Sequence, residues 1–173
     1  VLVLNNVRPL VLNWHQEHLP AIVEAWQLGT QSGNAIAQVL YGDYNPSGKL
    51  PMSFPRAVGQ IPIYYNYKNT GRPTLPAPGK VFWSHYQDVE NSPLYPFGYG
   101  LSYTTFEYSN LQAQAVSDKE VNVSVTLKNS GKLTGKEVVQ LYIRDHYASV
   151  TRPVRELKGF ELVSLEPNES KEI

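Results

Sequence analysis

The sequence predicts an α/β part followed by an all-β part. A short apolar run opens the chain and segments with helical spacing follow it, whereas apolar and polar residues alternate strictly beyond residue 120. Composition changes as well: residues 1–105 hold eleven of the thirteen prolines and fifteen of the twenty aromatic residues, while residues 106–173 hold nineteen of the thirty charged ones. We therefore predict two domains, at residues 1–105 and 106–173.

The α/β part is predicted to begin with two strands and two helices. Apolar runs at residues 1–4 and 10–12 are typical of strands covered on both faces. Apolar side chains then recur at helical spacing over residues 19–26, which predicts a first helix. A second helix is predicted over residues 35–40, and it ends at Gly42 because glycine is favoured just beyond a helix C-terminus.

Regular periodicity stops between residues 42 and 100, where Pro, Gly, Asn and Tyr dominate. Disordered segments are poor in aromatic residues, whereas this stretch is rich in them. We therefore expect an ordered, winding segment that is either functional or packed against a neighbour.

The all-β part is predicted from alternation and turn residues. Residues 121–127 alternate as in a half-buried strand, turn formers follow at 129–131, and residues 138–143 predict the next strand. We expect an antiparallel module of four or five strands. Since an immunoglobulin-like sandwich takes seven strands in about 100 residues, we expect this one to be incomplete by about a third.

Composition excludes several classes of protein. Fifteen basic residues balance fifteen acidic ones, which argues against a nucleic-acid partner. The chain has no cysteine for a disulfide or a thiolate metal site, and no apolar run approaches the roughly 20 residues that cross a bilayer. We expect a soluble protein with no membrane partner and no cofactor. Both ends interrupt a strand-like pattern, so we also expect a piece of a longer protein.

Three carboxylates lie in the loop-rich stretch, at Asp43, Asp88 and Glu90. Glycoside hydrolysis by paired carboxylates needs two of them about 5–9 Å apart, and nothing in the sequence brings these together. Asp43 stands among turn formers, where Asp commonly accepts hydrogen bonds from nearby backbone N–H groups. A structural role is favoured for Asp43 and a solvated loop position for Asp88 and Glu90. No catalytic residue is therefore predicted.

Metal and anion sites are also weakly indicated. His15 and His18 are three residues apart, yet no third ligand accompanies them at zinc-site spacing. Residues 29–33 are bounded by glycines but lack the lysine of a P-loop and follow a predicted helix, so we interpret them as a tight turn between helices. No metal site is expected. The remaining histidines are His85 and His146.

Aromatic side chains are the best binding candidates, because sugar rings stack on flat apolar faces. The alternative, which we favour, is that they cover a junction between domains. Triplets at Asn122 and Asn168 fit the acceptor pattern for N-glycosylation, a short pattern that often arises by chance. The aromatic candidates are Tyr64, Tyr65, Tyr67, Phe82, Trp83 and Tyr86.

Several stretches resemble glycoside hydrolase family 3 and follow that family's order. Residues 35–55 carry the run AIAQVLYGDYNPSGKLPMSFP, and residues 93–104 carry PLYPFGYGLSYT. Residues 138–160 contain VVQLYIRD and RPVRELKGF, which are similar to the family's fibronectin type III-like domain. Residues 60–73 look most like the periplasmic β-glucosidases of Gram-negative bacteria.

The resemblance implies a retaining exo-acting β-glucosidase built from a barrel, an α/β sandwich domain and a fibronectin type III-like domain. Residues 1–105 would be the C-terminal part of the α/β sandwich domain, and 106–173 an incomplete fibronectin type III-like domain. In this family the nucleophile is an Asp of the barrel and the acid/base a Glu upstream of residues 1–4, so neither lies in the chain. The implied partners are an oligosaccharide or glucoside substrate and the barrel. Periplasmic location or secretion is implied too, and a homodimer stays open.

The chain departs from the family's common residues in ways that put the activity of the parent enzyme in doubt. Acids are common at Gln31 and Gln38, and we expect the loss of two charges near a helix start to cost some stability. Two non-enzymatic functions stay open: a stand-alone carbohydrate-binding module, and a structural brace whose aromatic loop packs on the barrel. The departures are at Val7, Leu28, Gln31, Gln38 and His85.

Overall fold

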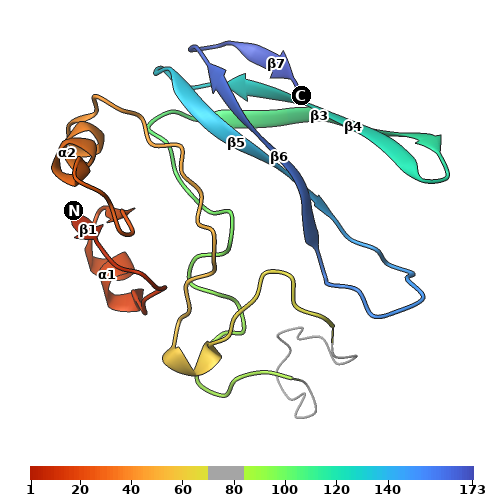
Figure 1. The fold of residues 1–173 in the computed structure, drawn as a ribbon, viewed down its shortest axis with the longest axis horizontal. Helices are drawn as coiled ribbons and strands as arrows, with labels where there is room; N and C mark the ends of the chain where they lie inside the picture. The colour runs from red at the N-terminus through yellow and green to blue at the C-terminus, as the bar shows by residue number, and fades with distance from the viewer. Residues whose placement is uncertain (70–83) are drawn as a thin grey trace. The chain divides into compact units, whose positions relative to one another are not determined.

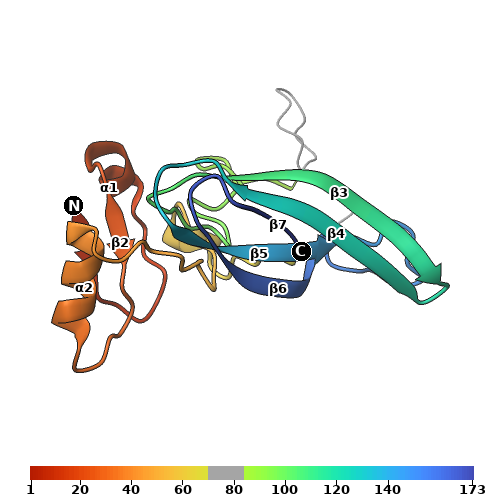
Figure 2. The ribbon, with the colours of Figure 1, turned by 90° about the horizontal axis from the view of Figure 1, so that it is seen from above.

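A computed structural model of the chain describes residues 1–69 and 84–173 (Figure 1). Short elements come first and longer strands follow, as a second view also shows (Figure 2). The described part is rich in strands and has few helices, in agreement with an α/β part followed by a β-rich part. In chain order the elements are β1 (Leu2–Leu4), α1 (Asn13–His18), β2 (Ile22–Glu24), α2 (Ser32–Tyr41), the 3₁₀ turn η1 (Val58–Gln60), β3 (Phe106–Ser117), β4 (Glu120–Asn129), β5 (Gly135–Ile143), β6 (Glu156–Leu165) and β7 (Ser170–Glu172).

The first elements form a parallel pair of strands joined through a helix. β1 confirms the predicted strand at residues 1–4, and it pairs with β2 so that Leu2 lies opposite Ile22. The prediction of a helix over residues 19–26 is wrong, because Ile22–Glu24 is extended and pairs with β1. β-branched side chains suit this strand, and a partner distant in sequence outweighs the local helical spacing.

The predicted strand at residues 10–12 is also wrong. Leu12 immediately precedes α1, and only 2% of its surface is exposed. It packs in a cluster with Phe54 and Leu94. The apolar run is therefore apolar because it fills a core, and not because it forms a strand.

The second predicted helix is confirmed as α2. Gly42 follows its last residue with a φ of +86°, a left-handed conformation that glycine adopts at little cost. Gln31 lies just before the helix, and its Oε1 accepts a hydrogen bond of 2.7 Å from the Asn34 amide. Gln38 lies in the second half of α2, so the helix-dipole argument applies to Gln31 and was wrong for Gln38.

Residues 42–69 and 84–100 wind without an α-helix or an extended strand, as predicted. They are nevertheless ordered by specific contacts. The Gln60 side chain is 3% exposed, accepts from the Arg56 N–H at 2.6 Å and donates to the Glu90 carbonyl at 2.7 Å. One buried amide therefore joins two segments 30 residues apart.

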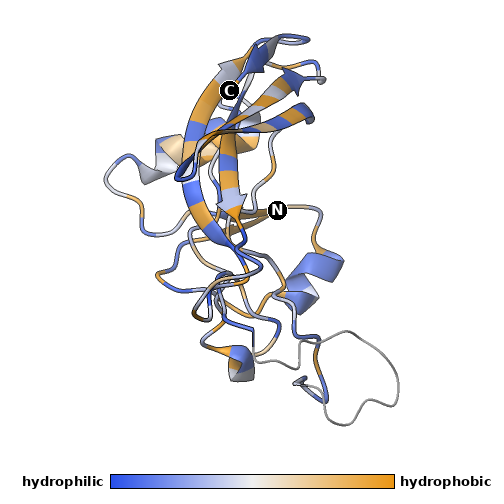
Figure 3. Ribbon diagram, turned by 90° about the vertical axis from the view of Figure 1, so that its right-hand side faces the viewer, coloured by the Kyte–Doolittle hydropathy of each residue, from blue (hydrophilic) through white to orange (hydrophobic). Residues whose placement is uncertain are grey.

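The strands after residue 105 form an antiparallel sheet in the order β3–β4–β7 and a two-stranded sheet β5–β6. These strands confirm those predicted around residues 121–127 and 138–143, and the number falls in the predicted range of four to five. Apolar and polar residues alternate along them (Figure 3). Leu127 on β4, 0% exposed, packs with Val163 and Leu165 on β6, so both sheets contribute to one core.

The chain divides into two compact units that interleave along the sequence. The first unit comprises Val1–Ile36, Lys49–Tyr99 and Gln140–Gly159, and the second Ala37–Gly48, Gly100–Val139 and Phe160–Ile173. The division into domains at residues 105 and 106 stays a prediction. In the described part of the chain, no helix has the length and apolar character needed to cross a membrane.

Candidate functional site

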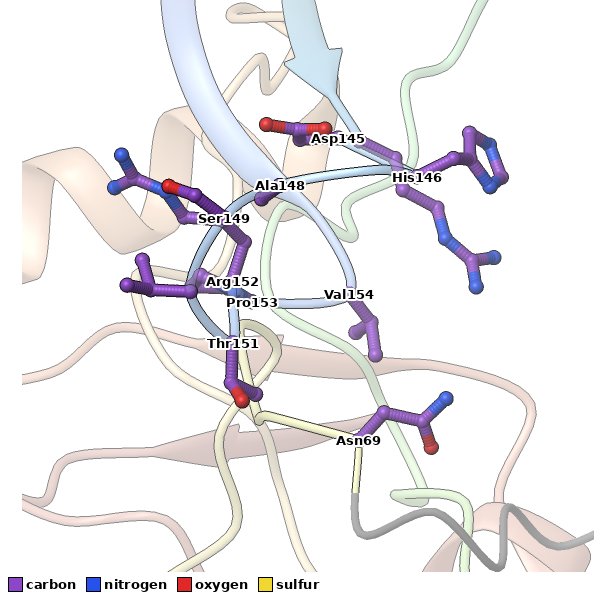
Figure 4. Close-up of a pocket in the computed structure, with 11 residues that line it drawn as sticks. Asn69, Asp145, His146, Ala148, Ser149, Thr151, Arg152, Pro153 and Val154 are labelled. Atoms are coloured by element: carbon purple, nitrogen blue, oxygen red, sulfur yellow. The ribbon is translucent and has the colours of Figure 1, made fainter.

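The β5–β6 connection of the first unit, residues 144–155, borders a hollow of about 470 Å³ that Asn69 also lines. Its lining is mostly polar or charged, with Arg144, His146 and Arg152 among the residues (Figure 4). The residues that line the hollow therefore provide mainly hydrogen-bonding groups and little apolar surface.

The winding segment before Asn69 positions this connection. The Val154 N–H donates to the Tyr67 carbonyl at 2.9 Å, and Lys68 pairs with Pro153 in an antiparallel bridge. Backbone pairing therefore fixes this segment beside the hollow, which its residue Asn69 lines.

The charged side chains at the hollow do not converge on one point. Figure 4 shows Asp145, His146 and Arg152 pointing in different directions. Asp145 Oδ1 accepts the N–H of Tyr147 at 3.0 Å, which makes it a turn-stabilising group. A hydrogen bond from Lys158 lowers the pKa of Glu156, and the charge of Arg152 lowers it further. This arrangement does not present two carboxylates to a substrate.

The aromatic candidates divide into packed and exposed side chains. Tyr65 stacks on Phe97 with ring centroids 4.1 Å apart and meets Tyr142 edge-on at 6.0 Å. Tyr64, Tyr67 and Tyr86 are 62%, 56% and 43% exposed. Tyr65 therefore packs on other aromatic rings, whereas Tyr64, Tyr67 and Tyr86 are exposed enough for a ligand to reach them. Phe82 and Trp83 lie outside the described residues.

Beside Tyr65, a glycine allows a close approach of the chain to β5. Gly98 has a φ of +79°, and a Cβ placed on it would lie 2.3 Å from Gln140 Oε1. The Gln140 amide donates to the Gly98 carbonyl at 3.1 Å, and the Tyr142 hydroxyl donates to Gln140 Oε1 at 2.6 Å. Burial raises the pKa of Tyr142, which keeps this hydroxyl a donor.

Replacing Gly98 by alanine should lower the free energy of unfolding by about 1–3 kcal/mol, because the left-handed backbone and the clash with Gln140 both penalise a Cβ. Urea unfolding of the full-length protein measures this loss. Gly59→Ala is the matched control, since nothing lies within 4 Å of its Cβ position. Equal stability of the two variants would contradict the role given to Gly98.

The three carboxylates singled out in the sequence belong to different parts of the chain. Asp43 belongs to the second unit and is exposed, whereas Asp88 and Glu90 belong to the first. Glu90 lies 3.2 Å from the Arg56 guanidinium and accepts from the Ser92 hydroxyl at 3.0 Å. The Glu90 side chain is 74% exposed, which agrees with the predicted solvated loop position, and it also forms this surface ion pair.

The histidine pair lies beside a tryptophan. His18 stacks on the exposed Trp14 with centroids 4.5 Å apart, and His15 meets the same ring edge-on at 5.4 Å. Among residues 1–69 and 84–173, no three His, Cys, Asp or Glu side chains gather as metal ligands would. Residues 29–33 follow strand β2, and not a helix as predicted, but they do form a tight turn in which the Ser32 N–H donates to the Gly29 carbonyl.

Glu24, the last residue of β2, was not singled out from the sequence. It is partly buried, and burial raises the pKa of its carboxyl. The available signal was its place directly after the β-branched residues Ile22 and Val23. Had these residues been recognised as a strand, Glu24 would have been placed at the end of that strand.

Two family models match the chain. The model of the glycosyl hydrolase family 3 C-terminal domain matches residues 1–103, and that of a fibronectin type III-like domain matches residues 137–173. Both agree with the resemblance seen in the sequence runs. The first alone covers more than half of the chain.

Individual proteins show the same similarity. The chain is 53% identical over its full length to the periplasmic beta-glucosidase of Salmonella typhimurium and 46% identical to a beta-xylosidase of Formosa agariphila, and it covers 23% of each. The crystal structure of a beta-glucosidase from Listeria innocua matches all of the chain with a TM-score of 0.93 at 47% identity, and 24% of that protein is covered. The chain thus spans about a quarter of the length of these relatives, and it belongs to glycosyl hydrolase family 3.

Proposed function

We propose that this chain is the C-terminal portion of a retaining exo-β-glucosidase that removes terminal β-D-glucosyl residues from oligosaccharides. The observation that carries the proposal is similarity along the whole chain to proteins named beta-glucosidases, in sequence and in three dimensions. The relative from Salmonella typhimurium is named periplasmic, which supports a periplasmic or secreted location.

In this proposal both catalytic carboxylates belong to the part of the enzyme outside the chain. The share of the relatives that the chain covers supports this, because about three quarters of each protein named a beta-glucosidase lies outside the matched part. Within the chain, Glu90 forms a surface ion pair with Arg56 at 3.2 Å.

The chain itself would serve as a scaffold in two domains. Residues 1–105 would end the α/β sandwich domain, and residues 106–173 would form an incomplete fibronectin type III-like β-sandwich. Packing of Tyr65 against Phe97 and Tyr142 supports a bracing role for the winding segment. The barrel and a glucoside substrate are the proposed partners, and a second copy of the enzyme is another.

We expect the full-length protein to hydrolyse an aryl β-glucoside, whereas the 173-residue chain alone should show no activity above buffer. Because one relative is named a beta-xylosidase, an aryl β-xyloside should be assayed beside it. Asp43→Asn and Asp88→Asn should keep kcat within about twofold in the full-length enzyme, since neither side chain touches the reacting sugar in this proposal.

The proposal is refuted if the isolated chain is active and either substitution abolishes that activity. The exposed tyrosines favour one rival, a carbohydrate-binding module. Calorimetric titration of the chain with cellobiose and laminaribiose, using Tyr67→Ala as the control, would support that rival if binding appears and the substitution removes it. If the full-length protein cleaves only the aryl β-xyloside, the proposed substrate would be a β-xyloside and not a β-glucoside.

A further inference from the structure

The C-terminal end of α2 is bonded to a residue far away in the sequence. The last carbonyls of a helix have no partner within the helix itself. The Val39 carbonyl, in the last turn of α2, accepts the Gly42 N–H at 3.2 Å and the Tyr103 hydroxyl at 2.6 Å. Tyr103 belongs to the linker, residues 100–105, which leads into β3. The linker therefore closes the end of the helix.

Asn45 lies just after α2 and holds the same linker with its side-chain amide. Its Oδ1 accepts the Ser102 hydroxyl and the Tyr103 N–H, each at 2.8 Å. Its Nδ2 donates at 3.0 Å to the Thr134 carbonyl, in the loop between β4 and β5. A backbone N–H only donates and a carbonyl only accepts, so turning the amide over would lose both of these bonds. One half-buried side chain thus joins three segments that are distant in sequence.

The loop between β4 and β5 also packs closely on these segments. A Cβ placed on Gly135 would lie 2.6 Å from Thr104 Cγ2 and 3.0 Å from Asn45 Nδ2, so glycine is what allows the approach. On the next residue, Lys136 Nζ lies 5.8 Å from the centre of the Tyr44 ring, as in a cation–π contact. Packing and charge therefore add to the hydrogen bonds of Asn45.

The three segments belong to one compact unit, the second, which also contains β4. Boundaries between domains usually fall in exposed linkers that few contacts cross. The predicted boundary at residues 105 and 106 has the opposite character, because Asn45 before it bonds to Thr134 beyond it. We propose that Asn45 locks residues 37–48, the linker and the β4–β5 loop into a rigid joint, and that this joint makes the end of α2 open and close as one cooperative unit with β4.

The joint predicts uncoupling and not merely a loss of stability. Asparagine suits the position because its amide both accepts and donates, whereas alanine does neither. Without the amide, the end of α2 loses its hydrogen bonds from Asn45 to the linker and the loop. β4 keeps its own partners, because it pairs with β3 and β7 through backbone hydrogen bonds that do not involve Asn45.

Asn45→Ala tests the joint by hydrogen–deuterium exchange of the full-length protein at increasing urea concentrations below the unfolding transition. In the unsubstituted protein, peptides from residues 37–48 should open with the same free energy and the same urea dependence as peptides from residues 120–129. In the variant, peptides from residues 37–48 should exchange about ten- to hundredfold faster and with a weaker urea dependence. Peptides from residues 120–129 should stay within about twofold of their original rate.

Two further variants make the result decisive. Asn122→Ala removes an exposed asparagine from β4 and should leave both sets of peptides unchanged. Tyr103→Phe removes only the hydroxyl that bonds to Val39, so it should separate the two sets in the same direction by about tenfold or less, and it replaces Asn45→Ala if that variant does not fold.

The proposal is overturned if residues 37–48 already open independently of residues 120–129 in the unsubstituted protein. It is also overturned if Asn45→Ala and Tyr103→Phe accelerate exchange equally in both sets of peptides, or in neither, since Asn45 would then not be what couples the end of α2 to β4.

Discussion

Asn129→Leu is expected to lower the free energy of unfolding by about 3–5 kcal/mol. Asn129 is 0% exposed at the end of β4. Its Oδ1 accepts from the Thr104 hydroxyl at 2.7 Å and from the Gly131 N–H at 3.1 Å. Leucine would keep the volume and leave these two partly buried donors without their acceptor.

The other half of the same amide holds two carbonyls. Asn129 Nδ2 donates to the Leu133 carbonyl at 2.8 Å and to the Leu165 carbonyl at 3.1 Å. One side chain therefore ties the loop before β5 and the end of β6 to β4. Urea unfolding of the full-length protein, followed by circular dichroism, measures the loss.

Two variants control this prediction. Asn122→Ala removes an exposed asparagine from the same strand and should change stability by less than about 0.5 kcal/mol. Asn129→Asp places a carboxylate against the Leu133 and Leu165 carbonyls, and its destabilisation should shrink as the pH falls and the buried acid is protonated. A cost below about 1 kcal/mol for Asn129→Leu would show that water replaces the amide.

Phe54→Ala is expected to cost a similar amount, about 3–5 kcal/mol, through the lost transfer energy and the cavity left behind. Phe54 is 1% exposed and packs with Leu12 and Leu94. Its ring meets Trp26 at 5.9 Å and Tyr95 at 6.3 Å. It also joins two winding segments, because its N–H donates to the Tyr95 carbonyl and its carbonyl accepts from Leu94, each at 2.8 Å.

Thermal unfolding of the full-length protein would reveal this loss as a lower Tm for the transition that includes the first unit. Val58→Ala, a 72% exposed position four residues further along, is the control and should leave the Tm nearly unchanged. If both variants unfold at the same temperature, the cluster around Phe54 does not limit the stability of the first unit.

The local spacing of apolar and polar residues predicted an element correctly where the spacing continues over many residues or where the residues that pack on the element are close in sequence. The alternation at residues 121–127 predicted β4, and the helical face at residues 35–40 with Gly42 predicted α2. The segment at residues 19–26 failed, since three or four apolar residues fit both a helical and an extended spacing. Pairing with β1, 20 residues away, decided in favour of the strand.

The candidate site was predictable in chemical type but not in arrangement. The sequence marked the aromatic cluster, and Tyr65 does pack while Tyr64 and Tyr67 stay exposed. It could not show that Glu90 pairs with Arg56, because that contact spans 34 residues of irregular chain. Glu24 was missed for a related reason: burial of a carboxyl is a property of the packed molecule.

By itself, the sequence determined the family and the α/β part followed by a β-rich part, because long ordered motifs and periodicity can be read from neighbouring residues. The tertiary structure decided which apolar run is a strand and which is core, as Ile22–Glu24 and Leu12 show. It alone placed Gln60 and Asn129 as buried hydrogen-bonding centres. Hydrogen bonding and burial depend on groups that meet only when distant segments pack, so no local pattern encodes them.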